Sequence, residues 1–115
     1  MYRSFEELEV WKRACKLAVE IYFALKDCRD YGLKDQMTRA AVSVASNIAE
    51  GAERNSVKEF THFMHIAKGS AAELRTQLYI AEKIELLTPA ITRPIITETK
   101  EISSMLQGLI KSIKR

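Results

Sequence analysis

The stretch that decides the fold is Gln36-Met37-Thr38-Arg39-Ala40-Ala41-Val42-Ser43-Val44-Ala45-Ser46-Asn47-Ile48-Ala49-Glu50-Gly51-Ala52-Glu53-Arg54. Its apolar residues recur every three to four positions, the period of a helix, and most of them are alanine or valine. Small side chains let neighbouring helix backbones approach closely. We therefore expect a helix from about Leu33 to Ala49 or a little beyond, deep among other helices. Gly51 is the expected left-handed C-cap.

A polar line runs along the same stretch, spaced by four, four, three and four: Arg39, Ser43, Asn47, Glu50 and Arg54. This spacing places the five residues on one helix face, which could simply be solvated. On a helix of small apolar residues, however, buried polar groups need polar partners. We therefore favour a structural hydrogen-bond network of Arg39, Ser43, Asn47 and Glu50. Glu50 would pair with Arg39, Arg54 or an arginine of a neighbouring subunit.

Upstream of this stretch, the capping box Ser4-Phe5-Glu6-Glu7 predicts the start of a first helix that Asp30 and Gly32 end. Two adjacent apolar lines follow the box: Leu8, Trp11, Cys15, Ala18, Tyr22, Leu25, and Val10, Ala14, Leu17, Ile21, Ala24, Cys28. Two lines indicate either a wide core face or a second buried surface at a subunit contact. The two cysteines are expected to be free thiols in the core.

Downstream, the capping box Ser56-Val57-Lys58-Glu59 predicts a long third helix to about Leu86. Gly69 lies in its middle, where close backbone packing would explain a glycine. A fourth helix is expected from Thr92 or Arg93, with Pro94 in its first turn. No stretch alternates like a strand. The expected fold is one all-α domain over residues 1–115, an up-down-up-down antiparallel four-helix bundle.

Composition points to a globular protein of the cytoplasm that crosses no membrane. Of the 115 residues, 47% are hydrophobic and 29% charged, and no apolar run approaches the ~20 residues of a membrane span. The net charge is +3, and residues 88–115 carry the whole surplus. A basic C-terminal segment is typical either of a solvated helix end or of a surface that contacts a polyanion. The candidate phosphate contacts are Arg54, Lys58, Lys111, Lys114 and Arg115.

The sequence offers little for catalysis. His62 and His65 are two potential metal ligands, fewer than a metal site needs, and an exposed polar edge is the better interpretation. Neither cysteine has a histidine at a suitable local spacing for a nucleophilic thiol. Arg54 precedes His62 with seven residues between them, which misses the arginine–histidine spacing of small all-α ribonucleases of toxin systems. We therefore predict no enzyme, no metal and no cofactor.

The run from Gln36 to Arg54 also resembles the four-helix-bundle family of ribosomal RNA intervening sequences. The resemblance extends to further segments on both sides: Leu8-Glu9-Val10-Trp11-Lys12-Arg13-Ala14, Ile21-Tyr22, Lys58-Glu59-Phe60, Phe63, Ile66-Ala67-Lys68-Gly69-Ser70 and Glu73-Leu74. It covers the chain from about Phe5 to Leu109, and Asn47 to Gly51 carry its most specific motif. After Leu87 only the helical pattern remains.

This resemblance implies a bundle that assembles into a homopentamer. The chain is also similar to the accessory variability proteins of diversity-generating retroelements, which are strongly basic pentamers that bind nucleic acid and a reverse transcriptase. A pentamer of this mildly basic chain would carry +15 and could gather it on one rim. Two functions follow as hypotheses: an oligomeric scaffold that binds RNA or DNA, or a protein-interaction module that docks a reverse transcriptase.

Overall fold

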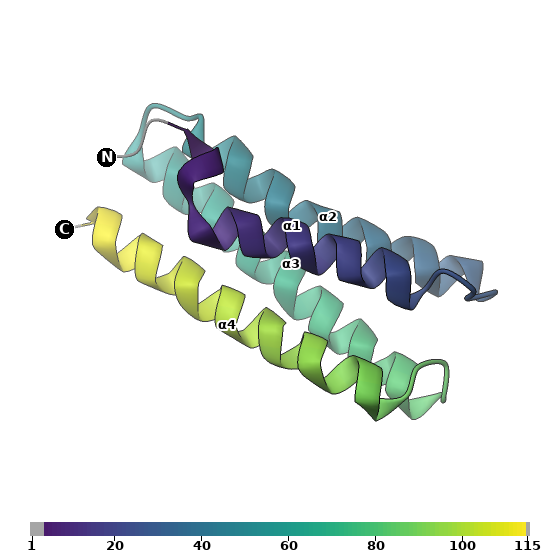
Figure 1. Cartoon of the computed structure of the whole chain (residues 1–115). Coiled ribbons are helices and arrows are strands. Elements are labelled where there is room, and N and C mark those ends of the chain that lie inside the picture. The colour runs from purple at the N-terminus through teal and green to yellow at the C-terminus, as the bar shows by residue number, and fades with distance from the viewer. Residues whose placement is uncertain (1–3, 115) are drawn as a thin grey trace.

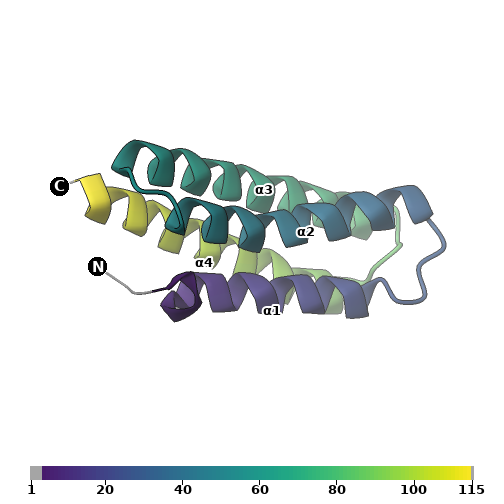
Figure 2. The same cartoon turned by 90° about the horizontal axis from the view of Figure 1, so that it is seen from above.

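The computed structural model describes residues 4–114 and shows four antiparallel α-helices. These are α1 (Glu9–Ala24), α2 (Tyr31–Ala52), α3 (Val57–Lys83) and α4 (Pro89–Lys114). Each helix packs on its neighbour in the chain, and α4 closes the ring against α1. The bundle measures 44 × 19 × 19 Å, and its two chain ends lie at the same end (Figures 1 and 2). The predicted all-α four-helix bundle is confirmed.

The core is aliphatic and takes one stripe from each helix. On α1 it uses the second of the two apolar lines, with Ala14, Leu17 and Ile21 fully buried. On α2 the small residues are buried as expected, including Ala40, Ala41 and Val44. The first line lies at the edge of the core: Trp11 and Cys15 are half-buried and Tyr22 is exposed, and only Leu25, just after α1, is fully buried.

The N-terminal capping box begins a shorter element than predicted. Ser4 caps the 3-10 turn η1 (Phe5–Glu7), where its side chain accepts from the Glu6 amide. Leu8 is extended, so α1 begins only at Glu9. The helix also ends early, at Ala24, which places Cys28 in the α1–α2 connection instead of on the helix. Both cysteines are free thiols, but they are half-buried rather than core residues.

The predictions for two glycines were wrong. Gly51 has no positive φ and lies inside α2, which continues to Ala52. A Cβ there would lie 2.7 Å from Met64 Cε and 2.8 Å from Phe63 Cβ, so Gly51 allows close packing on α3 instead of ending the helix. Gly69 is the reverse case: it is exposed, and a Cβ would meet nothing within 4 Å.

The fourth helix begins at Pro89, earlier than predicted, so Pro94 lies inside it and not in the first turn. Pro89 suits the first helical position because its missing amide proton has no partner there. Pro94 is tolerated near the start because Ala90, whose carbonyl loses its amide partner, is exposed to water. The third helix starts at the predicted cap, where Ser56 accepts from the Glu59 amide at 3.0 Å, and ends at Lys83. No helix within residues 4–114 is long and apolar enough to cross a membrane.

Candidate nucleic-acid interface

The polar line of α2 divides into a half-buried centre and two exposed ends. Asn47 Nδ2 donates to the carbonyl and the hydroxyl of Ser43 at 2.8 and 2.9 Å, and the Ser43 hydroxyl contacts the Ser70 hydroxyl of α3 at 2.9 Å. At the ends, Arg39 pairs with Asp35 and Glu50 pairs with Arg54, both at 2.9 Å. The line is therefore not one network. Its centre joins α2 to α3. Glu50 pairs with Arg54, which is one of the three partners expected for it.

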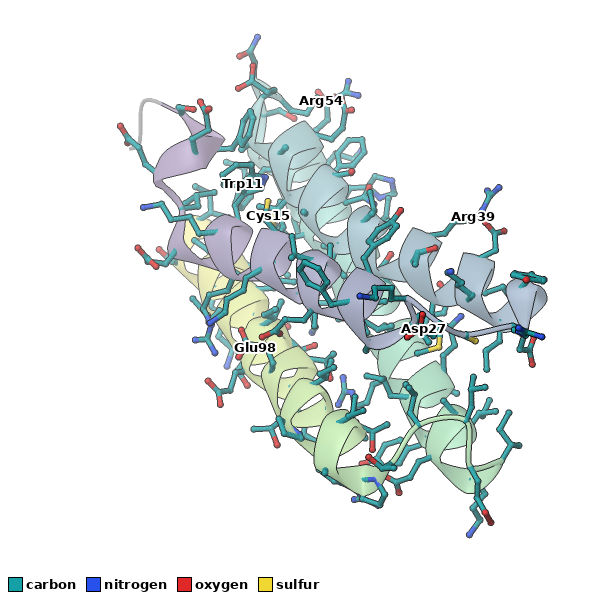
Figure 3. The ribbon with its side chains drawn as sticks, turned by 45° about the vertical axis from the view of Figure 1, so that its right-hand side comes forward. Trp11, Cys15, Asp27, Arg39, Arg54 and Glu98 are labelled. Atoms are coloured by element: carbon teal, nitrogen blue, oxygen red, sulfur yellow. The ribbon has the colours of Figure 1, made fainter. Side chains whose placement is uncertain are left out.

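The five predicted phosphate contacts do not form one free cationic surface. Arg54 is held by Glu50 at 2.9 Å and Glu59 at 3.4 Å and lies over the Phe63 ring. Figure 3 shows Arg39 and Arg54 pointing away from the bundle, Arg39 from within α2 and Arg54 from just beyond the end of this helix. Because two carboxylates already neutralise it, Arg54 is a poor phosphate ligand.

Lys58 and Lys111 are exposed at the same end of the bundle, at the start of α3 and near the end of α4 (Figure 1). Neither makes an ion pair with a described residue. The side chain of Lys114 and the whole of Arg115 lie outside the described part of the structure. This end of the bundle also carries Glu59, so it is a mixed surface and not a basic one.

A different cationic surface follows the groove between α3 and α4, and two contacts fix its register. Lys68 Nζ donates to Gln107 Oε1 at 2.5 Å, and Arg93 binds Glu82 at 2.7 and 3.0 Å. Arg75 is seven residues from both Lys68 and Glu82, and Lys100 is seven residues from both Arg93 and Gln107. Seven residues are about two helical turns, or about 10.5 Å, so Arg75 and Lys100 lie level with each other on this groove.

We call this surface the basic groove, formed by Lys68, Arg75, Lys100 and Lys111. Arg75 and Lys68 are half-buried, and the two lysines of α4 are exposed. Two carboxylates lie beside these cations, and each is bound to another arginine. Arg93 and the Thr92 hydroxyl bind Glu82, and Arg13 binds Glu101, which shares a surface hollow with Lys100. Arg93 lowers the pKa of Glu82 by hydrogen bonding, and Glu82 raises the pKa of Arg93. The cations of the groove therefore lack a counter-charge.

Sequence reasoning missed Lys68, Arg75 and Lys100. The net charge of +3 conceals them because acidic residues elsewhere in the chain balance most of the 18 lysines and arginines. The available signal was the heptad spacing 68–75 on one helix and 93–100–107 on the next. Positions seven apart stay on one side of a helix, so these two rows could have been matched once the helices were known to be antiparallel neighbours.

The opposite side of the bundle, between α1 and α2, carries an apolar surface. We call it the apolar flank, and it consists of the first apolar line of α1 and the facing stripe of α2: Trp11, Cys15, Ala18, Tyr22, Val42, Ala45 and Ala49. Tyr22 is 54% exposed and shares with Val42 a shallow groove of about 440 Å³, whose remaining lining is polar: Asp35, Thr38, Arg39, Ser43 and Ser46. Trp11 and Cys15 lie on the side of α1 toward α2 (Figure 3). Partial burial raises the pKa of the Cys15 thiol, which makes it a weaker nucleophile.

An arginine clamp joins α1 to α4. Arg13 Nη2 lies 2.5 Å from Glu98 and 2.5 Å from Glu101, and its Nε donates to Glu98 at 2.8 Å. Glu98 lies on the side of α4 that faces α1 (Figure 3). The hydrogen bonds that Arg13 donates to Glu98 and Glu101 raise the pKa of Arg13. The cluster sets two carboxylates of α4 against one guanidinium of α1, and we interpret it as a structural contact between these helices.

Within residues 4–114 no group of three or more histidine, cysteine and acidic side chains is placed to hold a metal ion. His62 and His65 are exposed on α3, and the His62 ring packs edge-on against Phe63 at 5.5 Å.

Comparison with known proteins supports the family resemblance. No functionally curated protein matches the chain. A crystal structure of a protein of unknown function from the S23 ribosomal protein family of Bacteroides thetaiotaomicron has the same fold, with a TM-score of 0.83 and 24% identity. The alignment covers 89% of this chain and 98% of that protein. The family described as 23S rRNA-intervening sequence protein matches residues 6–108. The chain therefore belongs to the 23S rRNA-intervening sequence protein family.

Proposed function

We propose that this protein is a non-enzymatic scaffold that binds the phosphate backbone of RNA or DNA through its basic groove. The observation that carries the proposal is the row of cations along α3 and α4 with no free carboxylate beside it. Lysine and arginine that neutralise phosphates release condensed counter-ions, and this release supplies most of the affinity of sequence-independent binding. Such contacts read no base, so we expect little sequence preference.

Self-association would strengthen this function. We propose a homo-oligomer, a pentamer as the family resemblance implies, with the apolar flank as its subunit contact. The exposed area at Tyr22 and Val42 supports this choice, because side chains of this size are costly to leave in water together. The basic groove lies on the opposite side of each protomer and would stay open to nucleic acid.

The test of nucleic-acid binding is fluorescence anisotropy with a labelled 20-base-pair RNA duplex between 50 and 200 mM NaCl. Four phosphate contacts give a slope of about −3.6 in log affinity against log salt, or a loss of roughly a hundredfold over this range. The triple substitution Lys68→Gln, Lys100→Gln and Lys111→Gln should reduce the slope by about 2.7.

The matched control is Lys12→Gln, Lys16→Gln and Lys26→Gln, which removes the same charge from α1 and the connection after it. This variant should bind almost as the unaltered protein does. Equal losses in the two triple variants, or a flat salt response, would contradict the proposed site. Alanine at Lys111, Lys114 and Arg115 tests the earlier tail hypothesis and should weaken binding without changing the assembly.

A second candidate function is docking of a protein, such as a reverse transcriptase. The observation that favours it is a row of exposed isoleucines, Ile66 and Ile80 on α3 and Ile84 just after it, on the side turned away from the basic groove. The discriminating measurement is co-purification with a reverse transcriptase encoded beside the gene. Loss of co-purification on Ile80→Glu, with duplex binding retained, would support this second function.

A further inference from the structure

The connection between α1 and α2 exposes two aromatic rings. Phe23, near the end of α1, is 72% exposed, and Tyr31, the first residue of α2, is 70% exposed. They are the two most exposed large apolar side chains within residues 4–114, and in this part of the chain neither ring contacts another ring or a guanidinium. The connection lies at the end of the bundle away from the two chain ends (Figures 1 and 2). Exposed apolar groups gathered in one place are typical of a binding surface.

Short local contacts hold the backbone between the two rings. The Lys26 amide donates to the Phe23 carbonyl at 3.3 Å, and Asp30 Oδ1 accepts from the Leu33 amide at 3.1 Å as the cap of α2. Lys34 Nζ donates to the Lys26 carbonyl at 3.5 Å, which ties the first turn of α2 back to the connection. The rings are therefore carried by an ordered turn between two helices.

Three cations lie in the same connection, and none of them forms an ion pair with a residue that the structure describes: Lys26, Arg29 and Lys34. Two carboxylates accompany them. Asp30 is used by the cap of α2, and Asp27 is exposed (Figure 3). Residues 22–34 therefore carry a net charge of +1. We call the two rings and the three cations the aromatic corner.

We propose that the aromatic corner binds unpaired bases of single-stranded RNA or DNA. Phe23 and Tyr31 each stack on one base, and the three cations contact the phosphates of the same strand. Every base has a flat π-face, so exposed aromatic rings beside cations suit a single strand of any sequence. This site goes beyond the proposed function, because its ligand is argued from the two rings and not from the basic groove.

A lipid surface fits the aromatic corner less well. The aliphatic side chains of this connection are turned inward, since Leu25 is fully buried and Leu33 is half-buried. They leave no aliphatic group to insert among acyl chains. A duplex also fits poorly, because its bases are stacked on one another and offer no free face. Duplex binding therefore does not report on the aromatic corner.

The test compares two labelled single strands of about twelve nucleotides by fluorescence anisotropy, oligouridine and an abasic strand of the same length. Phosphate contacts contribute to both strands alike, so the ratio of the two affinities measures what the bases add. Stacking contributes about fivefold or more for each ring. The unaltered protein should therefore bind oligouridine about 25-fold more tightly than the abasic strand.

Phe23→Leu and Tyr31→Leu each keep an apolar side chain but remove the ring. Each should reduce the ratio about fivefold, and the double variant should bring it close to one. Tyr31→Phe keeps the ring and should leave the ratio unchanged. Because both side chains are exposed, these substitutions should leave the fold intact.

Tyr79→Leu is the matched control. Tyr79 is also an exposed tyrosine, but the Arg93 guanidinium already lies over its ring, 5.5 Å from the ring centre. This substitution should leave the ratio unchanged. Arg29→Gln with Lys34→Gln should reduce the salt slope for both strands by about 1.4, again without changing the ratio, because these cations contact phosphates.

A ratio close to one for the unaltered protein, or an unchanged ratio in the double leucine variant, overturns the aromatic corner. An equal loss in Tyr79→Leu also overturns it, because the stacking would then not be confined to Phe23 and Tyr31. The proposed function fails separately. If the unaltered protein does not bind the RNA duplex at low salt but the ratio holds, the basic groove is wrong and the aromatic corner stands.

Discussion

The apolar flank and the basic groove occupy equivalent positions in the bundle but carry opposite kinds of side chain. Each is the outer groove between two antiparallel helices that follow one another in the chain. Between α1 and α2 the groove positions hold Trp11, Tyr22 and Val42, and between α3 and α4 they hold Lys68, Arg75 and Lys100. The helix ring places the two grooves on opposite sides. Two surfaces with different partners can therefore work on one bundle at the same time.

This difference shows why total charge says little about binding in a helix bundle. Acids pair with cations on α1 and α2, as Glu9 does with Lys12 and Asp35 with Arg39. On the α3–α4 side, cations outnumber free carboxylates. A net charge of +3 is consistent with a locally strong field, because field strength depends on how charges are distributed over the surface.

The largest expected effect comes from charging the apolar flank. Tyr22→Glu with Val42→Glu should dissociate the proposed oligomer, since each side chain loses about 1.5–3 kcal/mol of burial at a contact. Together this raises the dissociation constant of one contact more than a hundredfold. Light scattering measures the mass. Lys68→Glu with Lys100→Glu should leave the mass unchanged and abolish duplex binding. If the unaltered protein is a monomer, the apolar flank is not a subunit contact.

The sequence predicted the bundle well because its signals were local. Helical periodicity and the Ser56 cap specify elements, and the alanines of α2 specify close packing. The errors came from contacts that no local pattern reveals. Gly51 packs on Phe63 and Met64 of another helix, so its role depends on the tertiary contact and not on the helix end. Pro94 lies inside α4 because Pro89 had already begun it.

The candidate site was less predictable than the fold. Arg54 was a reasonable candidate from its position near a loop, but its neutralisation by Glu50 and Glu59 depends on how α2 and α3 meet. The only local signal for Arg75 was its seven-residue spacing from Lys68. The burial of its Nε without a hydrogen-bond partner depends on how the helices pack and could not be predicted from one helix.

A second, smaller effect tests whether the Arg13 clamp joins the α1–α2 pair to the α3–α4 pair. Arg13→Met removes the clamp between α1 and α4, whose arginine is 33% and Glu98 23% exposed. Charged hydrogen bonds of this kind contribute about 1–2 kcal/mol when partly exposed. Urea unfolding should show that loss, with duplex affinity unchanged. Lys12→Met, which removes an exposed pair with Glu9, should cost less than about 0.5 kcal/mol. Equal losses would mean that the clamp does not join the pairs.

Gly69 lies on neither the apolar flank nor the basic groove, so it can be changed without touching either surface. It is exposed on α3 with open space around its Cα, so Gly69→Ala should stabilise the protein by up to about 1 kcal/mol through helix propensity. Thermal melting measures the gain, and both the mass and the duplex affinity should stay the same. If this substitution changes either of them, α3 carries a third contact surface and the two-groove description is incomplete.

The smallest expected effect is the loss of folding stability when Glu82 of the basic groove is protonated at low pH. The hydrogen bonds from Arg93 and Thr92 lower the pKa of Glu82, so the folded state favours its ionised form. Stability from this group is therefore fully present above the pKa of the unfolded chain, about 4.3, and is lost as pH falls through the lower folded value. Glu82→Gln should be less stable than the unaltered protein at pH 7, and the difference should shrink between pH 5 and 3 because protonation removes the same pair. Urea midpoints across this range measure it. A difference that stays constant with pH would show that Glu82 supports α4 by packing alone, and that its ion pair with Arg93 adds no stability.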